Sequence, residues 1–116
     1  MDFDTARQLV LRQTLISRDS DQRPDTFITC LRRGNPPIPG QVTSLLLALK
    51  VLFEALRQEP SLDRPLVHAL FVLSYEIRQL FNAGQNRGVT WPPMLDDDLI
   101  RIAKGAQSIV FGEWQA

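Results

Sequence analysis

Eleven of the fifteen residues from Val42 to Leu56 are apolar, and they form the most hydrophobic stretch of this 116-residue chain. On a helix, where successive residues are turned by about 100°, they leave only a narrow polar stripe. That stripe consists of Thr43, Lys50, Glu54 and Arg57, with Leu47 lying among them. A helix of this kind is normally surrounded by neighbours on most sides. The sequence therefore predicts a central helix from about Pro39 to Gln58.

Helices are also predicted on both sides of this stretch, because the other apolar residues recur at spacings of three and four. Before it, we predict a helix capped by Asp2 or Asp4 that ends near Ser17 at the start of a polar break. A short second helix should be capped by Asp25 and ended by Gly34, where a left-handed conformation costs least.

After the central stretch, Ser61 or Asp63 can cap a fourth helix that runs to about Asn82. A loop of about ten residues should follow, since the next stretch is rich in Gly, Asn and Pro. The last helix should end near Gly112 and bury one stripe of Leu99, Ile102, Ala103, Ala106, Ile109 and Val110.

These patterns predict an all-α fold, a single compact bundle of about five helices with the third helix central. A chain of 116 residues has the commonest size of one domain, and we expect a single helical domain over residues 1–116. The proline-rich stretch from Arg33 to Gln41 is then a rigid turn between two helices. A proline-rich ligand for another protein is the alternative, because Pro36 and Pro39 have the PxxP spacing.

Composition narrows the classes of function. Thirteen basic residues balance thirteen acidic ones, which argues against nucleic acid as a partner. The single Cys30 fits a reducing compartment, and the start of the chain lacks the basic and apolar regions of a signal peptide. Since no stretch is long and apolar enough to span a bilayer, we expect a cytoplasmic protein without a membrane partner.

The fourth predicted helix carries a second apolar row opposite its core face, formed by Val67, Phe71, Tyr75 and Arg78, with His68 and Val72 beside it. Coverage of this row by another helix of the same chain is one interpretation. The other is a surface for a partner, since aromatic residues flanked by Arg are typical of interface cores. A homodimer seam is a variant of this second interpretation. We take Val67, Phe71, Tyr75, Arg78 and Trp91 as candidate partner-binding residues.

Residues with catalytic or metal-binding chemistry are few. Asp96, Asp97 and Asp98 are consecutive, so on a helix they point in different directions and suit a helix N-terminus better than one ion. Cys30 and His68 have no orienting motif around them. The chain also lacks phosphate-loop, dinucleotide-binding and zinc motifs. We therefore expect no catalytic residue, no metal and no cofactor. Trp91, which precedes two prolines, packs between helices in one interpretation and binds a ligand in the other.

The segments PPIPGQVTSLLLALKVLFEAL (36–56) and GVTWPPML (88–95) resemble a family of short helical proteins from cyanobacteria. Some members of that family carry the label dethiobiotin synthetase, but this chain lacks the phosphate loop that such an ATP-using enzyme needs. The chain is also similar to the CcmS family of carboxysome assembly chaperones, which act on shell proteins. This resemblance implies a protein partner and assigns no site residue.

Two classes of function remain open. The first is a non-catalytic adaptor or assembly factor that recognises a segment of a partner, such as a peptide tail. Eleven Arg against two Lys favour it, because Arg binds carboxylates with two hydrogen bonds and stacks on planar groups. The second is a small helical enzyme or metabolite-binding bundle whose site is not visible in the sequence. A metabolite that raises the melting temperature would favour the second class.

Overall fold

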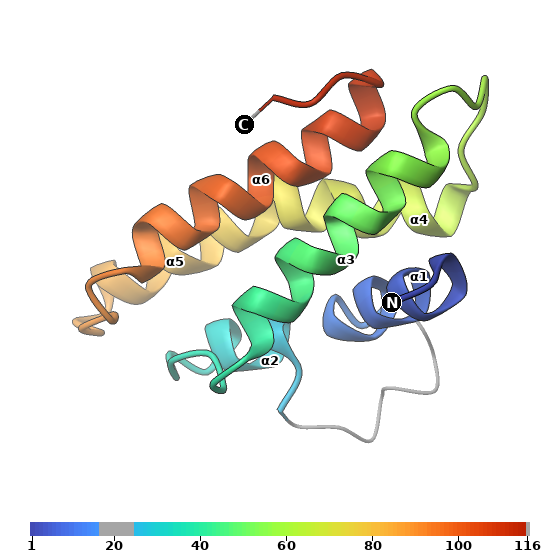
Figure 1. Cartoon of the computed structure of the whole chain (residues 1–116). Helices are drawn as coiled ribbons and strands as arrows, with labels where there is room; N and C mark the ends of the chain where they lie inside the picture. Colours follow the sequence, from blue (N-terminus) through green and yellow to red (C-terminus); the bar gives the residue numbers. More distant parts are fainter. Residues whose placement is uncertain (17–24, 116) are drawn as a thin grey trace.

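The computed structural model describes residues 1–16 and 25–115, and the regular elements among these residues are all helices, without any strand. The elements are α1 (Phe3–Gln13), α2 (Phe27–Arg32), α3 (Gln41–Leu56), α4 (Arg64–Phe71), the π-helical segment η2 (Val72–Glu76), α5 (Ile77–Asn86) and α6 (Leu95–Phe111). Because α4, η2 and α5 follow one another without a break, they form one helix, which we call helix 64–86. The described residues thus form five helices, and the predicted all-α bundle is confirmed (Figure 1).

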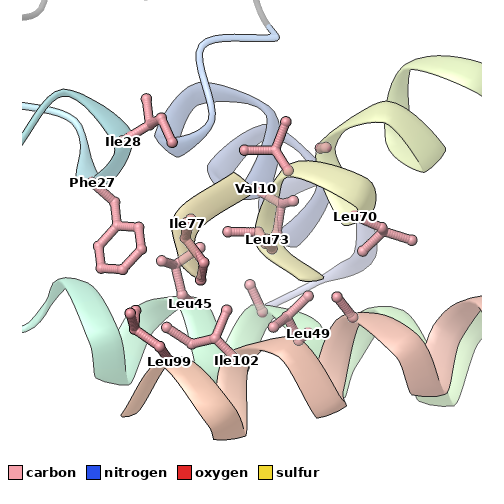
Figure 2. Close-up of a cluster of buried hydrophobic side chains, with 14 of the residues drawn as sticks. Val10, Phe27, Ile28, Leu45, Leu49, Leu70, Leu73, Ile77, Leu99 and Ile102 are labelled. Carbon is pink, nitrogen blue, oxygen red and sulfur yellow. The ribbon is translucent and has the colours of Figure 1, made fainter. Parts of the chain in front are cut away.

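The helices enclose one hydrophobic core. Helix α3 lies between α1 and α6 and contacts both, while α6 also packs on α4 and η2 (Figure 1). Helix α1 contacts α4, and α2 contacts α5. Figure 2 shows the side chains that meet inside, among them Leu45, Leu49, Leu99, Ile102, Val10, Leu73 and Ile77. The predicted polar stripe of α3 faces solvent, and Leu47 on that stripe is 51% exposed.

Helix α1 ends at Gln13, before the predicted end near Ser17, which lies outside the described residues. The hydroxyl of Thr14 donates to the carbonyls of Val10 and Leu11, at 2.9 and 3.2 Å, and Leu15 takes a positive φ of 60°. A side chain that binds the last carbonyls and a left-handed residue together stop the helix. The predicted polar break after Ile16 also lies outside the described residues, except for Asp25.

Thr26, and not Asp25, caps α2. Its hydroxyl oxygen accepts a hydrogen bond from the Thr29 amide at 3.3 Å. The carbonyl of Asp25 instead accepts a hydrogen bond from the side chain of Gln41, at 2.6 Å. This bond links the start of α2 to the start of α3.

The proline-rich stretch forms the connection between α2 and α3. Gly34 follows α2 with a φ of 75°, as predicted, and Gly40 caps α3 with a φ of 90°. Since α3 begins at Gln41, Pro39 precedes the helix. The predicted start near Pro39 is therefore two residues too early. The Gln41 side chain also accepts a hydrogen bond from the Ile38 amide at 2.9 Å, which holds the turn against the helix it precedes.

Helix 64–86 extends four residues beyond the predicted end at Asn82. The residues from Ala83 to Asn86 complete its last turn although their composition is typical of a loop. The connection to α6 is correspondingly shorter. Helix α6 ends where predicted, with Gly112 following it at a φ of 78°.

Asp63 stabilises the start of helix 64–86 and joins it to α1. Its carboxylate accepts a hydrogen bond from the Leu66 amide at 2.8 Å and pairs with Arg7 at 3.1 Å. The hydrogen bond from Arg7 is the main cause that holds the pKa of Asp63 below its ordinary value of 3.8. A carboxyl group with a lowered pKa contributes stability above its unfolded pKa and loses it as the pH falls through the folded one.

We therefore expect Asp63→Ala to lower the free energy of unfolding by about 1 kcal/mol at neutral pH, through loss of the cap. The difference from the wild type should shrink below the ordinary pKa of Asp. Urea denaturation at neutral and strongly acidic pH measures both values. Glu59→Ala, an exposed change just before this helix, is the control. A pH-independent difference would contradict the role of the charge.

Candidate functional site

The apolar row predicted on helix 64–86 faces solvent. Val67 is exposed, and Phe71 and Tyr75 are each 52% exposed. The rings of Phe71 and Tyr75 lie 5.4 Å apart between centroids and are tilted by 32°, so they form one aromatic pair. In the part of the chain that the structure describes, no helix covers this pair. The interpretation in which another helix of the same chain covers the row is therefore wrong for the helices of the described residues.

The segment η2 separates Phe71 from Ile77 and widens the helix at this point. The Ile77 amide donates to the carbonyl of Val72, five residues earlier, which defines a π turn. The hydroxyl of Ser74 donates to the Phe71 carbonyl at 3.2 Å. Val72 is buried, although a regular period of 3.6 residues predicted it beside the outer row. Val72 ends a regular α turn and lies three residues after the buried Ala69, so it falls at the edge of the core side.

Arg78 differs from the other residues of the row because Asp96 of the same chain already neutralises its charge. Its guanidinium lies 2.6 Å from a carboxylate oxygen of Asp96 and 3.3 Å from the Asp96 carbonyl. It also lies over the ring of Phe81, 5.0 Å from the centroid. Arg78 thus joins α5 to the start of α6, and Asp96 already compensates its charge within the chain.

Trp91 belongs to the core and not to a surface. It is only 8% exposed, and its ring stacks on Phe81 with 5.7 Å between centroids and an angle of 16°. The indole N–H donates to the Phe81 carbonyl at 3.0 Å, and the ring lies against Gly84. Little of the ring is available to a partner. We therefore leave Trp91 out of the surface proposed below, and its contacts agree with the interpretation of packing between helices.

Helix α6 adds exposed apolar residues that the pattern missed. Ile100 and Val110 are exposed, and Phe111 is 62% exposed. Val110 was predicted on the buried stripe, which is wrong because the buried side of α6 is turned toward Gly105 and Ser108. A Cβ on Gly105 would lie only 3.2 Å from Leu49, so the glycine allows α3 to approach closely. This close contact orients α6 and leaves Val110 outside.

A groove follows the contact between helix 64–86 and α6. It consists of two hollows of about 290 and 240 Å³ that share Ser74 and Gln107. The first hollow is lined by Val67, Leu70, Phe71, Val110 and Phe111, and the second by Ile77, Arg78, Leu99, Ile100, Ala103 and Lys104. Phe71 of the aromatic pair therefore lies on one wall of a groove whose other wall is α6, and Tyr75 lies beside Phe71 outside the lining.

The residues considered for chemistry lie apart from this groove or are neutralised. Cys30 is buried, and burial is the main cause that raises the pKa of its thiol, which disfavours the reactive thiolate. His68 is exposed on α4. Asp96 pairs with Arg78 and Asp98 with Arg101. Among residues 1–16 and 25–115, no three His, Cys, Asp or Glu side chains come together as metal ligands do.

None of the described helices is both long enough and apolar enough to cross a bilayer. No protein-family model, curated protein or solved structure matches the chain.

Proposed function

We propose that this chain is a cytoplasmic, non-catalytic protein-binding domain, an adaptor or assembly factor that recognises a segment of a partner protein. Its binding site is the aromatic surface, which we define as Val67, Phe71 and Tyr75 on helix 64–86 and Val110 and Phe111 on α6. The half-exposed pair of Phe71 and Tyr75 is the observation that carries this proposal. Large aromatic side chains gathered on a surface are typical of interface cores.

The arrangement of the aromatic surface supports binding of a protein segment. Phe71 and Phe111 come from different helices and line the same hollow, so one inserted side chain contacts both. Inserted side chains of this kind carry most of the binding energy in protein interfaces, where they become fully desolvated. The resemblance of segments 36–56 and 88–95 to carboxysome assembly chaperones makes shell proteins the first partners to test.

Phe71→Ser is expected to leave the fold intact and to remove partner binding. Because the side chain is half exposed, the free energy of unfolding should change by less than about 1 kcal/mol. Retention of the partner should fall at least about tenfold, as for residues central to an interface. The tagged variant and wild type are compared by thermal melting and by capture from native lysate, and each retained protein is then purified and titrated.

Leu47→Ser is the matched control, since Leu47 is equally exposed but lies on the outer stripe of α3. It should retain the partner at the wild-type level. Unfolding of Phe71→Ser, or equal retention by wild type and Phe71→Ser, would overturn the proposed surface. A wild-type dimer that Phe71→Ser converts to a monomer would identify the partner as a second copy. A metabolite that raises the melting temperatures of the wild type and of Phe71→Ser equally would favour the enzyme or metabolite-binding alternative.

A further inference from the structure

The groove has the length of a short helix. Its wall on α6 extends from Leu99 to Phe111, thirteen residues whose twelve steps of 1.5 Å rise about 18 Å. Spacings of three and four recur among the lining residues of this wall, which are Leu99, Ile100, Ala103, Lys104, Gln107, Val110 and Phe111. Helices pack by placing side chains of this spacing into the grooves of their neighbours. The groove thus presents about three turns of complementary surface.

The walls of the groove favour a helical occupant over an extended one. Both walls are helices, whose backbone amides and carbonyls are already bonded within the helix. An extended segment needs a sheet edge that exchanges backbone hydrogen bonds with it, and the groove has none. Ser74 and Gln107 are the uncharged polar side chains of the lining. A helix satisfies its own backbone and needs only apolar contacts from its host.

The charged residues of the groove all lie at one of its two ends. Arg78 and Lys104 are the charged residues of the lining, and both lie in the hollow away from Phe111. Arg78 is neutralised by Asp96, whereas Lys104 forms no ion pair with any described residue. A carboxylate on the occupant would therefore meet an available ammonium group at this end. The lining contains no carboxylate. The same groove of a second copy of this chain therefore offers no acidic group to Lys104.

We infer that the groove binds one amphipathic helix of a partner protein, with the apolar side of that helix against Phe71 and Phe111 and an acidic side chain against Lys104. This inference rests on the proposed function and specifies the class of partner. Acidic residues near the Lys104 end set the direction in which the helix lies. Apolar contacts supply most of the affinity, and the charge supplies the specificity.

A pair of synthetic peptides tests the inference. The first is a labelled helix of about 14 residues, long enough to fill the groove, with Leu at positions i, i+3, i+4 and i+7 and Glu beside them. The second is identical except that Lys replaces each Glu. Fluorescence anisotropy should show that the wild type binds the Glu peptide at least about tenfold more tightly than the Lys peptide. Lys104→Glu should reverse this preference, and Phe71→Ser should weaken both peptides.

Arg87→Glu makes the same change of charge at an exposed residue outside the groove and should leave the preference unchanged. Equal affinity for both peptides, a preference that Lys104→Glu does not alter, or no binding of either peptide would overturn the inference. Binding of phosphatidylserine vesicles without binding of the peptides would also overturn it, and would identify a membrane-facing surface. If capture from lysate still depends on Phe71, the proposed function stands although the helical occupant is wrong.

Discussion

Trp91→Ala should lower the free energy of unfolding by about 3 to 5 kcal/mol, the range for a large aromatic side chain removed from a core. The indole is buried, stacks on Phe81 and donates a hydrogen bond to the Phe81 carbonyl. The change removes all three contributions and leaves a cavity between α5 and the connection to α6. For a domain whose total stability is typically 5 to 15 kcal/mol, this loss brings the fold close to unfolding. Urea denaturation followed by circular dichroism measures the effect.

Trp114→Ala is the matched control for this prediction. Trp114 packs edge-on against Phe53, with 5.2 Å between centroids, and lies under the ammonium of Lys50, but it remains 39% exposed. Its loss should cost about 1 kcal/mol, as expected for exposed aromatic and cation–π contacts. Equal costs for the two tryptophans would show that Trp91 does not hold the two elements together.

Gly84→Ala should destabilise the wild type and stabilise the Trp91→Ala variant. A Cβ on Gly84 would lie 2.5 Å from the indole ring, so alanine forces the ring or α5 to move, at a cost of about 1 to 3 kcal/mol. Without the indole, the same alanine lies in a helix with free space beside it. It should then raise the free energy of unfolding by up to about 1 kcal/mol, because Ala has a higher helix propensity than Gly.

The double-mutant cycle of Gly84→Ala and Trp91→Ala measures this coupling directly by chemical denaturation. We expect the sign of the Gly84→Ala effect to change between the two backgrounds. The same sign in both would mean that the glycine is needed for another reason than the close approach of the ring.

Much of the fold follows from the sequence because helices depend mainly on local patterns. The narrow polar stripe of the central helix predicted its exposed side, including Leu47. The left-handed glycines at Gly34 and Gly112 marked helix ends correctly. Errors arose where tertiary contacts outweigh composition. The last turn of helix 64–86 contains Gly84 and Asn86, which favour a loop locally, yet packing of Trp91 on this turn keeps it helical.

The candidate site was predictable only in part, for a similar reason. Val67, Phe71 and Tyr75 lie on one helix, so their spacing alone placed them on a common face. Val110 and Phe111 join them only because α6 is rotated by the close contact of Gly105 with Leu49, a detail of packing between distant segments. The ion pair of Arg78 with Asp96 likewise joins residues of different elements. No periodicity within one element reports such contacts.

The π segment η2 gives helix 64–86 a place where its length can vary. A π turn contains one residue more than the α-helical turn that would replace it, and the extra residue is accommodated locally. A one-residue deletion within 72–76 therefore converts the segment to a regular helix and leaves the core-facing residues of α4 and α5 in place. Within this segment Val72 and Leu73 are buried whereas Tyr75 is exposed, so a deletion beside Tyr75 changes mainly the outward side. Evolution can thus reshape the recognition surface through a change in chain length, without rebuilding the interior.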